Sequence, residues 1–66
     1  MRLTVNGAAA QESPGGTLAT LLEHLGYAQP CVATAVNGAF VPAQQRAGLA
    51  LRDGDAVEIV APMQGG

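Results

Sequence analysis

Apolar and polar residues alternate in two segments of this chain, the pattern of strands with one buried face. In the first segment, Leu3 and Val5 share one face. In the second, Val57 and Ile59 share one face. The alternation therefore predicts two strands, at residues 1–5 and 56–61.

Four leucines recur at i, i+3, i+4 and i+7, the spacing of one helix face: Leu18, Leu21, Leu22 and Leu25. Thr17 precedes them as an N-cap, because its hydroxyl can accept hydrogen bonds from the free N–H groups of the first turn. Gly26 follows as a natural stop in the left-handed conformation. We predict a helix over residues 17–25, with Leu21 and Leu22 in the core.

Two Asn-Gly dipeptides, Asn6-Gly7 and Asn37-Gly38, predict hairpin turns, because both residues tolerate positive φ. The first turn leads into a weaker strand at 8–12. The second joins strands at 32–36 and 40–42. Pro42 lacks a backbone N–H, so the return strand is expected to lie at a sheet edge or to stop there.

The element order is ββαβββ, which predicts an α+β fold with a mixed sheet of four to five strands packed on one helix. The first and last strands are able to lie side by side in such a sheet. Residues 1–61 would form this domain, and residues 62–66 a flexible tail.

Size and charge exclude several classes of function. A chain of 66 residues has little room for a deep substrate pocket, which counts against a self-sufficient enzyme. The net charge is −2 and lysine is absent, so there is no basic stripe for nucleic acid. No apolar stretch reaches the roughly 18 residues of a membrane span. A single cysteine excludes a disulfide framework, and we expect a cytoplasmic, monomeric protein.

Few side chains suggest chemistry. His24, in the last helical turn, is expected to be a solvated residue without a catalytic or metal role. Cys31 is expected to fill space as a small buried hydrophobe. Asp53, Asp55 and Glu58 form an acidic cluster, which is either a solvated surface or a docking patch for a basic partner.

The sequence ends in Gly65-Gly66. Glycine has no Cβ, so such a segment can enter a narrow channel and approach the active site of another protein. A terminal carboxylate on a flexible arm is what a protein needs if its own end is the substrate. The alternative is a frayed chain end without function.

Four stretches together resemble the ThiS family of sulfur carriers in thiamine biosynthesis: Asn6-Gly7, residues 17–25, residues 32–42, and residues 51–60 leading to Gly65-Gly66. The resemblance implies a ubiquitin-like β-grasp fold. One segment departs from the family. After Val41-Pro42 the family commonly has Arg and then, three residues on, Trp, where this chain has Ala43 and Arg46. If those side chains help docking, this protein docks differently.

The resemblance implies that this protein is a co-substrate and not an enzyme. A ThiF-type adenylyltransferase would use ATP to adenylate Gly66, and sulfur from a cysteine-desulfurase system would convert it to a thiocarboxylate. A ThiG-type thiazole synthase would then take the sulfur. Met63, Gln64 and Gly65 would enter the partner active sites with Gly66. Asp55, Glu58 and Phe40 are candidates for docking; no bound cofactor or metal is implied.

Three alternatives remain from the sequence. The chain could be the small subunit of a molybdopterin synthase, or a sulfur carrier for another pathway. It could also be a ubiquitin-like binding module with an inert tail.

Overall fold

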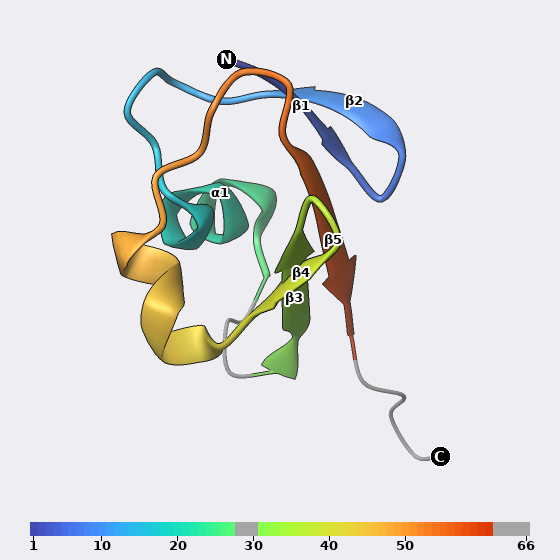
Figure 1. Cartoon of the computed structure of the whole chain (residues 1–66), viewed down its shortest axis with the longest axis vertical. Coiled ribbons are helices and arrows are strands. Elements are labelled where there is room, and N and C mark those ends of the chain that lie inside the picture. Colours follow the sequence, from blue (N-terminus) through green and yellow to red (C-terminus); the bar gives the residue numbers. More distant parts are fainter. Residues whose placement is uncertain (28–30, 62–66) are drawn as a thin grey trace.

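A mixed sheet and one α-helix pack against each other in the structure, a computed structural model that describes residues 1–27 and 31–61. Within these residues the strand order is β2-β1-β5-β3-β4, and Figure 1 shows α1 on one side of the sheet. The elements are β1 (Arg2–Val5), β2 (Ala8–Gln11), α1 (Leu18–Leu25), β3 (Ala33–Val36), β4 (Ala39–Val41), the 3-10 helix η2 (Ala43–Gly48) and β5 (Ala56–Val60).

The two hairpins turn at the predicted dipeptides. Asn6 and Gly7 have φ values of 52° and 83°, and Asn37 and Gly38 have 53° and 82°. Positive φ at both central residues is the geometry of a type I′ turn, which Asn-Gly favours. β4 ends at Val41 and lies at the edge of the sheet, which confirms the prediction made from Pro42.

β5 lies at the centre of the sheet. It runs parallel to β1, with Val5 opposite Val57, and antiparallel to β3, with Ala33 opposite Val60. The first and last strands are therefore neighbours, and β5 is the last element before residue 61. The mixed sheet on one helix confirms the predicted fold class.

Both ends of α1 are capped as predicted. The Thr20 N–H donates to Thr17 Oγ1 at 3.2 Å, and the Thr17 N–H donates to Thr20 Oγ1 at 2.8 Å. This reciprocal pair satisfies free donors of the first turn. Gly26 has φ 84° and its N–H bonds back to Glu23 O, so the helix ends in a left-handed cap.

The core lies between α1 and the facing side of the sheet. Its buried side chains are Leu3, Leu18, Leu21, Leu22, Val41, Leu51, Val57 and Ile59. The prediction for Leu21 and Leu22 is confirmed. Leu25, at the end of the leucine stripe, is 44% exposed, so the core contact of this helix face ends one turn earlier.

Candidate functional site

The predicted reactive segment, Met63, Gln64, Gly65 and Gly66, lies outside the described residues. What the structure describes is the strand that leads to it and the surface beside that strand. Val57 and Ile59 of β5 are buried against α1, while Glu58 and Val60 alternate onto the opposite face. The exposed side chains at the end of β5 are therefore on the side of the sheet away from the helix.

An exposed surface occupies this side of β3, β4 and β5. We call it the helix-free surface; its residues are Ala33, Ala35, Phe40, Glu58 and Val60, which line a shallow hollow of about 240 Å³ together with Thr34. Ala35 lies opposite Phe40 on one side and Glu58 on the other, and Ala33 lies opposite Val60. Phe40 is 70% and Val60 64% exposed.

Exposed apolar side chains at the centre of a patch with a charge beside them are typical of protein interfaces. The structure thus brings Phe40 and Glu58, two of the predicted docking residues, onto one surface.

The third, Asp55, lies elsewhere. It precedes β5, where its Oδ1 accepts from Asn37 Nδ2 at 2.9 Å and its Oδ2 from the Arg52 N–H at 2.8 Å. Asp53 likewise accepts from the Arg2 N–H, at 2.7 Å. Both carboxylates hold the turn that enters β5, so the acidic cluster seen in the sequence is divided between this turn and Glu58.

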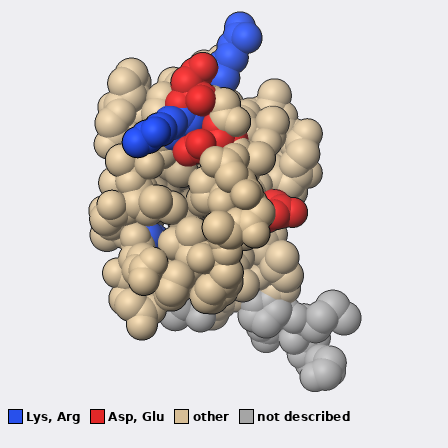
Figure 2. All heavy atoms as spheres, in the orientation of Figure 1, with Lys and Arg blue, Asp and Glu red and all other residues tan. Residues whose placement is uncertain are grey.

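Charged side chains gather at one end of the face shown in Figure 2, where acidic and arginine side chains lie close together at the top. Uncharged residues cover most of the rest of that face. Opposite charges that neighbour each other in this way partly cancel, so this end is a weak source of long-range attraction for a basic partner.

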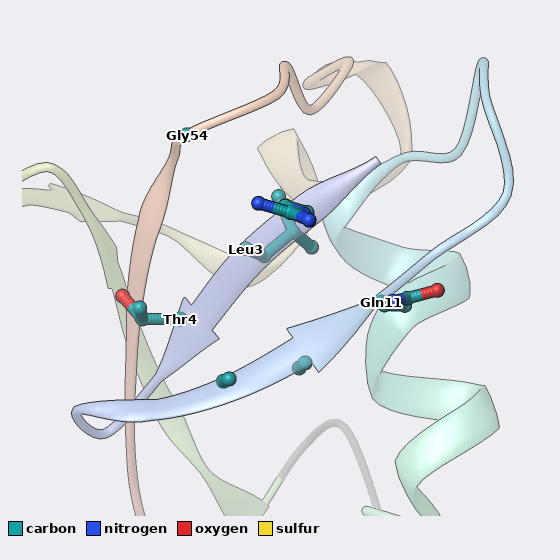
Figure 3. A pocket seen from close by; sticks show the side chains of 7 residues that line it. Leu3, Thr4, Gln11 and Gly54 are labelled. Atoms are coloured by element: carbon teal, nitrogen blue, oxygen red, sulfur yellow. The ribbon is translucent and has the colours of Figure 1, made fainter.

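A second hollow, of about 530 Å³, opens over β1 and β2. Its lining includes Arg2, Thr4, Ala9, Gln11 and Gly54. Figure 3 shows Thr4 on β1, Gln11 on β2, and Gly54 at the entrance to β5. The hollow is open and carries a single charged side chain among these residues.

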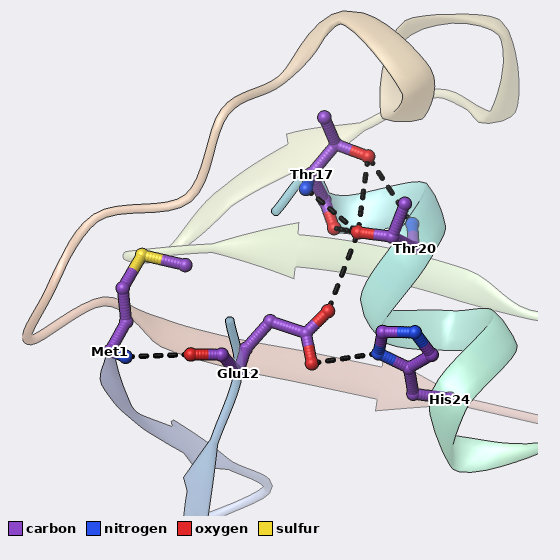
Figure 4. Close-up of polar contacts among 5 residues, drawn as sticks. All are labelled: Met1, Glu12, Thr17, Thr20 and His24. Carbon is purple, nitrogen blue, oxygen red and sulfur yellow. Dashed lines mark hydrogen bonds and ion pairs between the residues drawn. The ribbon is translucent and has the colours of Figure 1, made fainter. Parts of the chain in front are cut away.

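His24 has a partner that the sequence did not reveal. Its Nδ1 lies 2.9 Å from Oε1 of Glu12, whose side chain is only 4% exposed while that of His24 is 60% exposed. The Thr20 hydroxyl donates to the other Glu12 oxygen at 3.4 Å, and the Met1 ammonium donates to the Glu12 carbonyl at 2.6 Å (Figure 4). His24 is solvated as predicted, but it also joins α1 to the segment after β2.

Cys31 is exposed, so the prediction of a buried cysteine is wrong. β3 begins only at Ala33, and Cys31 therefore takes no inward position in the sheet.

Among residues 1–27 and 31–61, no group of three or more His, Cys, Asp or Glu side chains could hold a metal ion. No helix in the same part of the chain is both long and apolar enough to cross a membrane.

A model of the ThiS family matches residues 2–66. The chain belongs to the ThiS family. A comparison with curated protein sequences found no match.

Two solved structures share the fold of this ThiS-family chain. One is a crystal structure of a thiamine biosynthesis protein, ThiS, from Geobacter metallireducens, with 33% identity, full coverage of both chains and a TM-score of 0.84. The other is a solution structure of a thiamine biosynthesis protein from the same organism, with 33% identity and a TM-score of 0.82. It covers 100% of this chain and 88% of that one. The ubiquitin-like β-grasp fold expected from the sequence is thereby confirmed.

The departure from the ThiS family pattern at Arg46 lies inside the protein. Arg46 is 2% exposed; its Nε donates to Thr34 Oγ1 at 3.0 Å and its Nη2 to the Val32 carbonyl at 2.6 Å. The Thr34 hydroxyl in turn donates to the Val41 carbonyl at 2.9 Å. Arg46 therefore joins η2 to β3 and β4, while Ala43 at the start of η2 is exposed. A partner that contacts the folded surface meets Ala43 and not Arg46.

Proposed function

We propose that this protein is a sulfur carrier of thiamine biosynthesis, and that the carboxylate of Gly66 is its reactive group. The observation that carries the proposal is the ThiS family match, which extends over residues 2–66 and so includes Gly65-Gly66. The similarity to two thiamine biosynthesis proteins over the whole of this chain favours thiamine over the molybdopterin pathway. In this proposal the protein is a cytoplasmic co-substrate, and its partners catalyse every step.

The first step makes a poor electrophile reactive. A ThiF-type adenylyltransferase would direct a Gly66 carboxylate oxygen onto the α-phosphorus of ATP, so that pyrophosphate leaves and an acyl-adenylate forms. A persulfide supplied by a cysteine-desulfurase system then attacks the acyl carbon, and AMP leaves. A second thiol attacks the donor cysteine's sulfur in the resulting acyl disulfide, so that the S–S bond breaks, a disulfide forms with the donor, and the Gly66 thiocarboxylate leaves. A ThiG-type thiazole synthase would receive this sulfur.

The helix-free surface supports the proposal as the docking surface for the adenylyltransferase. It lies along β5, the last strand before Gly66 in the sequence, so a partner that covers Phe40 and Val60 also lies beside the end of that strand. Burying two exposed apolar side chains supplies affinity, and holding the carrier in place converts the attack on ATP into an intramolecular event. Glu58, in the same row as Phe40, would steer a basic partner surface.

The test is a reconstituted reaction with ATP, the adenylyltransferase and a sulfur source, followed by mass spectrometry of the intact protein. We expect a mass gain that corresponds to sulfur replacing one oxygen, located to the C-terminal peptide. Omitting ATP is the control and should abolish the gain. An unchanged mass in the complete mixture would make the tail inert and favour a binding module. Stable copurification with a large synthase subunit would instead indicate the molybdopterin pathway.

A further inference from the structure

The side chain of Asn6 holds β5 two residues before the described chain ends. Its Oδ1 accepts from the Ile59 N–H at 2.8 Å, and its Nδ2 donates to the Ile59 carbonyl at 3.1 Å. One amide thus satisfies both backbone groups of a single residue, although the two residues are 53 positions apart along the chain. The backbone N–H of Asn6 also donates to the Val57 carbonyl at 2.9 Å.

This amide replaces a pair of backbone hydrogen bonds that the sheet lacks. The N–H groups of Thr4 and Asn6 donate to the carbonyls of Asp55 and Val57, so the parallel ladder advances by two residues at each step. The next pair of backbone hydrogen bonds would need a residue of an extended strand beside Ile59. At Asn6, however, the backbone adopts φ 52° and turns away into the hairpin. The Asn6 side chain takes the place of that strand residue.

Unpaired backbone groups at Ile59 would destabilise the sheet, because this residue is buried. Ile59 is 5% exposed, and buried backbone N–H and carbonyl groups without partners destabilise a strand. On its other side β5 is paired with β3 as far as Val60. Asn6 therefore satisfies the backbone groups of Ile59 on the β1 side of β5, one residue before the strand ends at Val60.

We propose that Asn6 is a positioning residue for the C-terminal tail. The proposal rests on the proposed function, in which Gly66 must reach an active site while the helix-free surface is docked. Without the Asn6 amide, the end of β5 from Ile59 onward would be held only by its pairing with β3, which reaches Val60, and Val60 would be less firmly fixed on the docking surface. The partner would then have to reorder residues 59–61 on binding, and ordering each backbone residue opposes binding. The expected effect is an increase of about tenfold in the KM for this carrier, with kcat little changed, because the docked complex is the same.

Asn37 provides a matched control. It is the corresponding residue of the other Asn-Gly turn, with φ 53°. Its amide also bonds to the segment entering β5, with Oδ1 accepting from the Ala56 N–H at 3.0 Å and Nδ2 donating to Asp55 Oδ1 at 2.9 Å. These contacts lie at the start of β5, at the opposite end of the strand from Val60. Glycine accepts positive φ and supports two-residue hairpins, so Asn6→Gly and Asn37→Gly each remove an amide while keeping the turn.

The experiment compares the two glycine variants with the unmodified protein. Amide hydrogen exchange, followed by NMR, should become at least about tenfold faster at Ile59 in Asn6→Gly only. The adenylation assay should show the rise in KM in Asn6→Gly and not in Asn37→Gly. Equal KM values for both variants, or unchanged exchange at Ile59, would overturn the positioning role.

Two further outcomes separate causes. If Asn6→Gly does not fold, Asn6→Asp replaces it. This variant keeps an acceptor for the Ile59 N–H but places a carboxylate oxygen against the Ile59 carbonyl, so a rise in KM is expected, and an unchanged KM would overturn the proposal. If the unmodified protein is not adenylated at all, the proposed function fails and the positioning role fails with it. If it is adenylated and Asn6→Gly behaves identically, only the positioning role fails.

Discussion

The Glu12 carboxylate lies beneath the His24 imidazole, with Oε1 and Nδ1 2.9 Å apart, and it is the more deeply buried of the two groups. A carboxylate that is almost fully buried needs hydrogen-bond donors, and here α1 supplies His24. The Thr20 hydroxyl contributes a longer contact of 3.4 Å, because it shares its one hydrogen with the Thr17 carbonyl at 2.9 Å. The contact therefore fixes the segment after β2 against the helix. Neither residue belongs to the helix-free surface.

We expect His24→Ala to lower the free energy of unfolding by about 0.5–1.5 kcal/mol, because Glu12 loses a hydrogen-bond partner. The measurement is denaturant unfolding of His24→Ala, Glu12→Gln and the double variant, which together isolate the coupling between the two residues. Additive effects would show that the two side chains do not interact in solution. Gly16→Ala offers an independent check: its Cβ would lie 2.9 Å from Glu12 Cγ, so it should displace the carboxylate and lower the coupling.

The leucines of α1 allow a sharper test of the core. Leu22 is fully buried and Leu25 is 44% exposed, although both belong to the same stripe in the sequence. Leu22→Ala should cost about 2–5 kcal/mol, against a total stability of roughly 0.05–0.15 kcal/mol per residue. We expect this variant to be largely unfolded at physiological temperature, while Leu25→Ala melts close to the unmodified protein. Similar melting midpoints for the two variants would contradict the packing of the helix on the sheet.

Local signals were enough to predict most of the fold. The Asn-Gly turns, the caps at Thr17 and Gly26, and the alternation in β5 each depend on neighbouring residues, and each is found as predicted. The position of β5 between β1 and β3 was predicted only in part, since sequence order allows the first and last strands to meet but does not require it.

Three unpredicted features depend on residues that are distant in the sequence. The Glu12–His24 pair and the Asn6–Ile59 contact join separate elements, and no residue spacing along the chain predicts them. Burial of Arg46 could not be foreseen from composition, because charged side chains are rarely buried unless they are paired. Here Thr34 and the Val32 carbonyl accept its hydrogen bonds. The prediction that Cys31 is buried was wrong, because the usual burial of cysteine does not determine the position of a residue that precedes a strand.

The helix-free surface can be tested by reversing its charge and removing its aromatic side chain. Phe40→Ala should raise the KM of adenylation by about tenfold or more, since it removes a large apolar contact from the proposed interface. Glu58→Arg should slow association mainly at low salt, where charges are least screened. Neither side chain is buried, so melting temperatures should change little.

Leu25→Ala is the matched control for this surface, because it removes another exposed hydrophobic residue, on the helix side of the protein. It should leave the KM unchanged. An equal effect of Leu25→Ala and Phe40→Ala, or salt-independent rates for Glu58→Arg, would place the docking surface elsewhere.

The position of the terminal carboxylate gives the strictest test of the proposed function. Deleting Gly66 moves the carboxylate back by about 3.3 Å, and misplacement near 1 Å can already reduce a rate by about 10²-fold. Adding an alanine after Gly66 should fail as well, because its Cβ and the additional peptide must enter a channel that accepts glycine, and Gly65→Ala should be impaired for the same steric reason. All three variants keep residues 1–61 intact, so their melting temperatures should match that of the unmodified protein. Thiocarboxylate formation, measured by mass spectrometry with ATP, the adenylyltransferase and a sulfur source, should fall by orders of magnitude in each; unmodified levels from the protein lacking Gly66 would eliminate Gly66 as the reactive residue.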